Sequence, residues 1–259
     1  MTIFDGSQIK IGEGAQAAVY FYNGFAYKVY NDTYPKPWIA FESTIQKEIS
    51  KTNLPVVNYY NTDVPNIIRM DFIDGVTLGQ RMINEGYNNG VEDLINLQKM
   101  IHKIIRPNIP RFIPWAKEDI HRMTIDDQKK LRAMEYLESV PEGENLLHLD
   151  FHFQNIMYGK GKYYIIDWIN ARVGNPIFDY ARSFVIMNEV SQEFSSGYLK
   201  CIFEDGNIDF NEFNKALYIM ALMRVKENTS EKTLTLIESL ENKQMESIFG
   251  AAGIKIDGD

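Results

Sequence analysis

His148-Leu-Asp-Phe-His-Phe-Gln-Asn-Ile-Met157 is the stretch from which the fold of this chain can be worked out. It reads H-x-D-x-x-x-x-N, and an apolar run that ends in a carboxylate, Tyr163-Tyr-Ile-Ile-Asp167, follows it. Between the two stretches, Gly159-Lys-Gly-Lys162 predicts a hairpin. The strand that ends in this carboxylate can therefore return to the turn that carries Asp150 and Asn155.

These three polar side chains match what phosphoryl transfer from a nucleotide requires. A carboxylate must receive or orient the attacking hydroxyl group, and further groups must hold Mg²⁺ against the phosphates. Asp150 is the candidate for the first role. Because Mg²⁺ prefers hard oxygen ligands, Asn155 and Asp167 are the candidates for the second role. The pattern therefore predicts an enzyme with Asp150 as its catalytic residue and a metal site at Asn155 and Asp167.

Other interpretations account for part of the pattern. Asp and Asn favour turns, so these residues could be ordinary turn residues beside a hairpin. His148, Asp150 and His152 also form H-x-D-x-H, which could bind a hydrolytic metal, although Asn155 would then have no role. A nucleotide-binding regulator without turnover is a third possibility, and we expect such a protein to have lost one of the three polar residues.

A second set of signals near the N-terminus indicates phosphate binding. Gly12 and Gly14 permit a tight turn whose backbone amides can approach phosphate oxygens, and Ala17 stands where a third glycine is expected. The residues that follow favour β-strands, and Asn23-Gly24 is a strong hairpin signal. The pattern predicts three antiparallel strands, with the glycine-rich turn between the first two.

Lys28 lies within the third predicted strand. Side chains alternate between the two faces of a strand, and the residues that share a face with Lys28 are not typical of a solvent-exposed face. We predict that Lys28 binds phosphate, and such a lysine needs a carboxylate to hold it. In the helix predicted from Trp38 to Lys51, Glu42 falls near the apolar stripe. A charged residue among core positions usually has a partner, so Glu42 is the preferred partner of Lys28, and Glu48 is the second candidate.

Together these residues resemble the aminoglycoside phosphotransferase and choline kinase-like family. The resembling segments follow one another through most of the chain: residues 9–30, 68–78, 97–102, 148–157 and 165–182. The resemblance implies a bilobal, protein kinase-like α+β fold. It also implies a small antiparallel-sheet N-lobe that binds the nucleotide, residues 1–73, and a larger, mostly helical C-lobe for catalysis and acceptor binding, residues 74–259.

The resemblance assigns the same roles to the three polar residues and adds others. Asp71 and Ile73 would offer backbone groups to the purine of ATP or GTP at the hinge, and Asp179 would brace the catalytic loop. Two residues that differ from the family pattern bear on the backbone and on the substrate. Leu149 stands where the family usually has Gly, and Ile169 stands where many relatives carry a carboxylate.

A protein kinase is the nearby alternative. In such an enzyme a long activation segment follows the metal-binding Asp. Here only Trp168 to Asn175 separates Asp167 from Pro176 and a predicted helix, Ile177 to Met187. Since this leaves little room to order a peptide, we predict a small-molecule acceptor.

The remaining segments are predicted to be mostly helical. Apolar residues recur at helical spacing from Val91 to Ile105, and His102 beside them is expected to be a hydrogen-bonded core residue. Another helix is expected from Ile125 to Val140. In the resembling family such helices help to build the acceptor pocket. The acidic candidates for that pocket, each of which could equally face solvent, are Glu118, Asp119, Asp126, Asp127, Glu189, Glu193, Glu204 and Asp205.

Composition narrows the choice of partners. The chain of 259 residues has 27 Lys and Arg against 35 Asp and Glu, a formal net charge of −8. Nucleic-acid binding requires patches of basic residues, and no such patch stands out in the sequence. The acidic excess favours a cationic acceptor such as an aminoglycoside. A metabolite kinase acting on choline, ethanolamine, homoserine or a sugar is the alternative.

The sequence carries no signal for a membrane or an oxidising compartment. No segment approaches the roughly 18 apolar residues of a transmembrane helix, and the first residues do not resemble a signal peptide. Cys201 is the only cysteine, which excludes an internal disulfide. We expect a cytoplasmic protein that is a monomer or a weak dimer.

Overall fold

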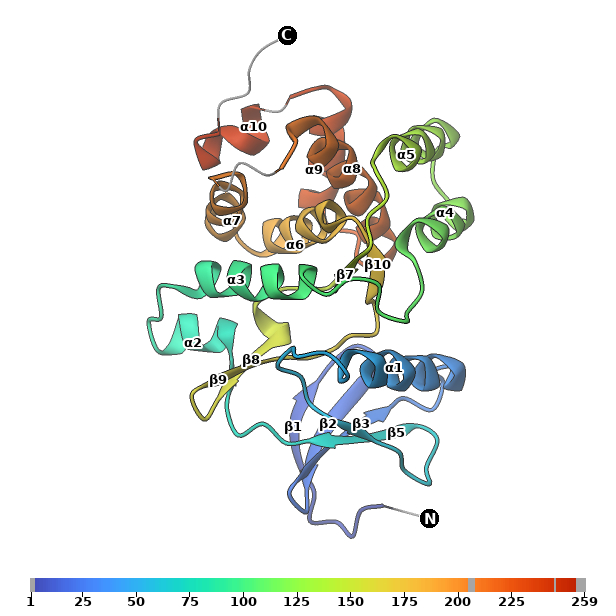
Figure 1. The fold of residues 1–259 in the computed structure, drawn as a ribbon, viewed down its shortest axis with the longest axis vertical. Helices are drawn as coiled ribbons and strands as arrows, with labels where there is room; N and C mark the ends of the chain where they lie inside the picture. Colours follow the sequence, from blue (N-terminus) through green and yellow to red (C-terminus); the bar gives the residue numbers. More distant parts are fainter. Residues whose placement is uncertain (1–2, 205–207, 245, 255–259) are drawn as a thin grey trace. The chain divides into compact units, whose positions relative to one another are not determined.

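The computed structural model describes residues 3–204, 208–244 and 246–254 (Figure 1). The chain forms two compact units. Unit 1 comprises Met1–Gly86 and Gln154–Ile169, and unit 2 comprises Tyr87–Phe153 and Asn170–Asp259. Residues 74–86 and 154–169 thus pack with the strands of residues 1–73, while the functional division at residue 73 stays a prediction. Among the described residues, no helix is both long and apolar enough to span a membrane.

An antiparallel sheet of five strands forms one half of unit 1, in the order β1-β2-β3-β5-β4. The strands are β1 (Ile9–Glu13), β2 (Ala17–Tyr22), β3 (Phe25–Tyr30), β4 (Tyr59–Tyr60) and β5 (Ile67–Asp71). Asn23 and Gly24 both adopt positive φ between β2 and β3, the geometry of a tight two-residue hairpin turn. The predicted meander and its hairpin are therefore confirmed.

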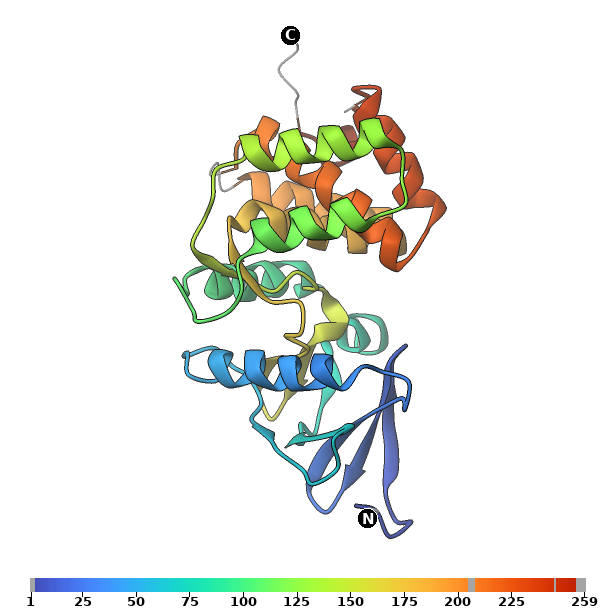
Figure 2. The same cartoon turned by 90° about the vertical axis from the view of Figure 1, so that its right-hand side faces the viewer.

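Helix α1 (Lys36–Ile49) lies against this sheet (Figures 1 and 2). Its buried residues are Ile39, Glu42, Ile45, Gln46 and Ile49, which recur at helical spacing. Ile39 packs into an apolar cluster with Ala17, Tyr30 and Ile68 of the sheet. One carboxylate, Glu42, is thereby carried into the apolar side of the helix.

A second, three-stranded sheet completes unit 1, in the order β6-β8-β9. Its strands are β6 (Val76–Thr77), β8 (Ile156–Gly159) and β9 (Lys162–Ile165), and helix α2 (Leu78–Asn84) follows β6. Lys160 and Gly161 form the predicted hairpin turn, both with positive φ. Strand β9 ends at Ile165, earlier than predicted, because Asp167 adopts left-handed backbone with φ +65°.

Unit 2 is mostly helical. Its helices are α3 (Gly90–His102), α4 (Phe112–Arg122), α5 (Asp127–Ser139), α6 (Pro176–Val190), α7 (Gln192–Glu204), α8 (Phe210–Glu227), α9 (Glu231–Glu241) and α10 (Glu246–Phe249). Strands β7 (Asn145–Leu147) and β10 (Arg172–Gly174) form a short antiparallel pair. Helices α6 and α8 contribute the most buried residues and pack against each other, so they form the core of this unit.

The helices predicted in unit 2 are present, and α4 is an addition to them. Helix α3 covers most of the predicted segment from Val91 to Ile105, and α5 covers most of that from Ile125 to Val140. Helix α4 lies beside α5 (Figure 2). Its third residue is Pro114, which a helix tolerates in its first turn but which masks the helix in the sequence.

Candidate active site

Lys28 and Glu42 form the predicted ion pair inside unit 1. The Lys28 Nζ lies 2.9 Å from Glu42 Oε1 and 3.2 Å from Glu42 Oε2. The Glu42 side chain is completely buried, and that of Lys28 is 16% exposed. Glu48, the second candidate, lies on another face of α1 and pairs with Lys51 at 2.5 Å. The choice made from helical spacing is confirmed.

Two tyrosines that the sequence did not indicate complete the environment of Glu42. The hydroxyl of Tyr59 donates to Glu42 Oε1 at 3.0 Å, and the hydroxyl of Tyr30 donates to Glu42 Oε2. Glu42 therefore has hydrogen-bond donors on both oxygens. A buried carboxylate needs such partners, because an uncompensated charge in the interior is strongly destabilising.

The charge of Lys28 is stabilised by two carboxylates. Its Nζ also lies 3.2 Å from Asp167 Oδ1. Burial alone would lower the pKa of Lys28, but the negative charges of Asp167 and Glu42 outweigh burial and hold this pKa well above its usual value. Lys28 is therefore a fixed positive charge in the part of unit 1 that holds Asp167.

A strained turn presents the Asp167 carboxylate. Asp is one of the few residues besides Gly that adopt left-handed backbone with some ease. The turn is fixed on both sides: the Ile166 amide donates to the Asn155 carbonyl at 3.0 Å, and the indole of the fully buried Trp168 donates to the Ile165 carbonyl at 3.2 Å. The Asp167 side chain remains 37% exposed and can reach a ligand.

A single cavity of about 740 Å³ in unit 1 brings the predicted binding residues together. Its volume lies within the usual range for small-molecule sites. The predicted residues that line it are Gly12, Gly14, Lys28, Asp71, Ile73, Asn155 and Asp167. Glu42 does not line the cavity, but its ion pair with Lys28 orients the lysine side chain. Apolar side chains of Val19, Ala26, Val57 and Met70 contribute to the wall, as a flat aromatic base would need.

The glycine-rich turn lines this cavity with unused amides. The Gly14 amide donates to the Ala17 carbonyl at 2.8 Å, whereas those of Ala15 and Gln16 make no hydrogen bond within the described residues. A Cβ on Gly12 or Gly14 would meet its nearest protein atom only at 3.6 Å or 3.7 Å, which is ordinary contact. The protein itself therefore does not require glycine at these positions, and the space they leave is available to a ligand.

Of Asp71 and Ile73, the two residues predicted to contact the purine through their backbone, mainly Ile73 has free backbone groups. The Asp71 amide is engaged by the Asn58 carbonyl at 3.1 Å, and the Asp71 carboxylate accepts from the Asn58 amide and the Tyr60 hydroxyl. In the part of the chain that the structure describes, neither backbone group of Ile73 makes a hydrogen bond. Ile73 thus has both a donor and an acceptor available to a purine, while Asp71 retains no free amide.

The residues of the cavity suit a magnesium ion. Asp167 supplies a carboxylate and Asn155, which is 8% exposed, supplies an amide oxygen. Mg²⁺ is usually bound by one or two such ligands together with substrate phosphates and water. The alternative site at His148, Asp150 and His152 fits a metal less well: among the described residues, no three His, Cys, Asp or Glu side chains are grouped so that they could share an ion.

In unit 2 the loop that carries Asp150 is held through the preceding residue. Leu149 is buried and has left-handed backbone with φ +60°, a conformation that Gly adopts more readily than a residue with a Cβ. The Leu149 amide donates to Asp179 Oδ1 at 2.6 Å, and Asp179 Oδ2 lies 2.8 Å from His102 Nε2. Asp179 thus braces the loop as the resemblance implied, and His102 is the hydrogen-bonded core residue that we predicted.

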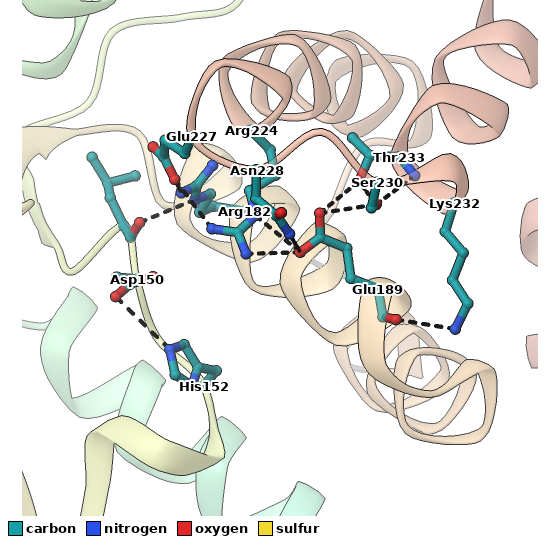
Figure 3. A network of polar contacts seen from close by, with 11 residues as sticks. Asp150, His152, Arg182, Glu189, Arg224, Glu227, Asn228, Ser230, Lys232 and Thr233 are labelled. Carbon is teal, nitrogen blue, oxygen red and sulfur yellow. Dashed lines mark hydrogen bonds and ion pairs between the residues drawn. The ribbon is translucent and has the colours of Figure 1, made fainter. Parts of the chain in front are cut away.

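Asp150 is surrounded by basic side chains. Its Oδ2 lies 3.8 Å from His152 Nε2 (Figure 3). Burial would raise the pKa of Asp150, but the interaction with the His152 side chain and the proximity of Arg182 and His148 outweigh burial and lower this pKa below its usual value. Asp150 is therefore ionised at neutral pH.

Many acidic candidates for the acceptor pocket are already engaged. Glu189 accepts from Arg224 at 2.7 Å and from the hydroxyl groups of Ser230, which caps α9, and of Thr233 within α9 (Figure 3). Glu118 pairs with Arg122, Asp119 pairs with Lys226, and Asp126 accepts from amides at the start of α5. Asp205 lies outside the described residues. The pairs Glu189–Arg224 and Asp119–Lys226 join residues far apart in the sequence, so they cannot be recognised from local sequence.

Solved structures of low sequence identity share the fold. A choline/ethanolamine kinase family protein from Mesorhizobium loti matches with a TM-score of 0.62 and 12% identity, over 96% of this chain and 92% of that chain. A thermostable mutant of the aminoglycoside phosphotransferase APH(4)-Ia, without ligands, matches with a TM-score of 0.60 and 15% identity, over 95% and 91%. The same enzyme in a ternary complex with AMP-PNP and hygromycin B matches with a TM-score of 0.60 and 14% identity, over 96% and 91%.

These likenesses confirm the predicted fold class, a kinase-like α+β structure with an antiparallel sheet followed by a mostly helical part. No curated protein matches the sequence. A family model described as the phosphotransferase enzyme family matches residues 8–200, which is most of the chain. The chain therefore belongs to the phosphotransferase enzyme family.

Proposed function

We propose that this protein transfers the γ-phosphoryl group of ATP or GTP to a hydroxyl group of a small molecule in the presence of Mg²⁺. One observation carries the proposal: a cavity in unit 1 is lined by Lys28, Asn155, Asp167 and the amides of the glycine-rich turn. Phosphoryl transfer depends on positioning and on neutralisation of charge, and these groups provide both.

In this proposal the nucleotide is bound by unit 1. The turn from Gly12 to Ala17 covers the phosphates and donates the amides of Ala15 and Gln16 to them. Lys28, oriented by Glu42, contacts the phosphates as a point charge. The purine lies against the hinge, where Ile73 provides a donor and an acceptor.

Asn155 and Asp167 would hold Mg²⁺ beside Lys28. When bound, the metal neutralises negative charge on the phosphate oxygens. The buried Trp168 fixes the turn that carries Asp167 through its hydrogen bond to the Ile165 carbonyl, so the carboxylate needs little rearrangement to act as a ligand.

Asp150 orients the acceptor hydroxyl and takes its proton late in the reaction. The transition state of phosphoryl transfer is loose, so little base strength is needed before the acceptor bond forms. An ionised, weakly basic Asp150 suits that role because it accepts a hydrogen bond from the hydroxyl throughout.

The acceptor in this proposal is an aminoglycoside-type or other cationic molecule. The net charge of −8 supports it. A solved structure with the same fold was determined with AMP-PNP and hygromycin B. Choline, ethanolamine, homoserine and sugars remain the alternative acceptors, because several carboxylates of unit 2 are occupied by arginine and lysine.

We expect a non-hydrolysable ATP or GTP analogue with Mg²⁺ to stabilise the protein. At a hundred times its dissociation constant, a ligand contributes about 2.7 kcal/mol, which corresponds to a rise in melting temperature of roughly 5–10 °C for a chain of this size. Differential scanning fluorimetry with and without Mg²⁺ measures the shift. If neither analogue moves the melting temperature at millimolar concentration, the nucleotide site is not where we place it.

Lys28→Met is expected to weaken nucleotide binding about tenfold to a hundredfold, since a hydrogen bond to a charged group contributes about 1.5–3 kcal/mol. Glu42→Gln should weaken it less, because Lys28 remains but is less well held. Glu48→Gln is the matched control on the same helix, and it should change the dissociation constant by less than about twofold. Titration calorimetry measures all three. The assignment fails if Glu48→Gln weakens binding and Glu42→Gln does not.

A further inference from the structure

Arg182 is a buried cation of unit 2 that the proposed reaction does not use directly. It lies in α6, is 3% exposed, and its Nε donates to the Leu149 carbonyl at 3.2 Å (Figure 3). Its Nη2 forms an ion pair with Glu227 at the end of α8. A buried arginine with a backbone carbonyl and a carboxylate as partners is fully oriented, since its planar fork satisfies both at once.

The carbonyl that Arg182 contacts belongs to the peptide plane that also contains the Asp150 amide. Peptide units are planar, so holding the Leu149 carbonyl fixes the orientation of the Asp150 amide. Asp179 holds the other side of Leu149 through its amide, at 2.6 Å. Asp179 and Arg182 are three residues apart in α6 and therefore lie on the same face of the helix.

Helix α6 thus holds both peptide planes that flank the Leu149 Cα, one through Asp179 and the other through Arg182. This matters because Leu149 has φ +60°, a conformation that is unfavourable for a residue with a Cβ and persists only when the surroundings impose it. Asp179 alone fixes only the first plane. Without the contact to its carbonyl, the ψ angle of Leu149 could relax, and Asp150 would then leave its position in the loop.

We propose that Arg182 is a positioning residue that sets the place of Asp150 by fixing the Leu149 carbonyl. The inference rests on the proposed function, because it assigns Arg182 a role only through Asp150. Glu227 acts one step further away by orienting the guanidinium group of Arg182.

The same ion-pair network supplies a matched control. Arg224 also pairs with Glu227, at 3.1 Å, and with Glu189, at 2.7 Å (Figure 3). Its side chain is 19% exposed, and within the part of the chain that the structure describes its polar contacts are with Glu227 and Glu189 and not with the loop that carries Asp150. Arg224→Met therefore disturbs the network and the packing of α6 with α8 without releasing the carbonyl of Leu149.

The test compares Arg182→Met, Arg182→Lys and Arg224→Met in the full chain. We expect Arg182→Met to lose about tenfold to a hundredfold in single-turnover rate, the size of effect that small misplacements cause. The dissociation constant of the nucleotide analogue should stay within about twofold. Arg182→Lys, which keeps the charge but not the fork, should fall between this variant and the wild type. Arg224→Met should keep the wild-type rate.

Hydrogen exchange gives a readout that does not need the acceptor. Arg182→Met should accelerate exchange of the amides at residues 148–152, whereas Arg224→Met should not. If Arg182→Met melts before the assay, Arg182→Lys carries the same comparison. Wild-type rate and wild-type exchange in either Arg182 variant would overturn the inference, as would an equal loss in Arg224→Met. A wild-type protein that transfers phosphate to nothing would instead contradict the proposed function.

Discussion

Asp150→Asn is expected to lower the single-turnover rate of phosphoryl transfer at least about a hundredfold, because a positioned general base contributes on the order of 10²–10⁴-fold. Asn keeps the size of the side chain and can still accept a hydrogen bond, but it can neither take the proton nor carry the charge. The loss should fall on the chemical step, since Asp150 belongs to unit 2 and the cavity proposed to bind the nucleotide is formed by unit 1. The dissociation constant of the nucleotide should therefore stay near that of the wild type.

Rapid-quench measurements with a large excess of enzyme test this expectation, because slow product release could hide a slowed chemical step in steady-state rates. Asp126→Asn is the matched control. It makes the same substitution in unit 2 at the residue that caps α5, where Asp and Asn serve equally well. Wild-type single-turnover chemistry in Asp150→Asn would remove this residue from the mechanism.

Asp167→Asn is expected to lower turnover about a hundredfold at millimolar Mg²⁺ and to raise the Mg²⁺ concentration needed for half-maximal rate. Loss of groups that merely support metal ligands already costs about 10–100-fold in metal affinity or activity, so loss of a charged ligand should cost at least as much. Asn is the better substitution than Ala, since Asn tolerates the left-handed backbone of this residue. The fold should persist because the side chain is 37% exposed.

A titration of the rate with Mg²⁺ separates weaker metal binding from a damaged fold. Weaker binding is recovered in part by more Mg²⁺, whereas damage to the turn at Trp168 is not. Near-normal turnover of Asp167→Asn at low Mg²⁺ would show that the metal is held elsewhere.

Much of the site follows from local sequence, since the features concerned depend on residues close in the chain. The hairpins at Asn23-Gly24 and Lys160-Gly161 rest on positive φ, which few residues adopt. The partner of Lys28 could be chosen because helical spacing distinguishes the face that carries Glu42 from the face that carries Glu48.

The rest of the site depends on contacts that no local pattern encodes. Tyr30 and Tyr59 are aromatic residues of strands, typical of a core, and only the packing of α1 on the sheet turns their hydroxyl groups to Glu42. Arg182 reaches Leu149 across 33 residues of sequence, and Arg224 reaches Glu189 across 35. These interactions are properties of the folded chain, so the sequence indicated the chemistry of the site better than its supporting network.

The most direct test of phosphoryl transfer follows the label of γ-³²P-ATP and γ-³²P-GTP into small molecules. Wild-type protein, Asp150→Asn and Asp126→Asn are incubated with Mg²⁺ and each of a set of hydroxyl acceptors: aminoglycosides, choline, ethanolamine, homoserine and sugars. We predict a labelled phosphate ester with at least one acceptor, dependent on Mg²⁺ and absent with Asp150→Asn. Tight nucleotide binding by the wild type with no label transferred to any acceptor would contradict it and would leave a nucleotide-binding regulator.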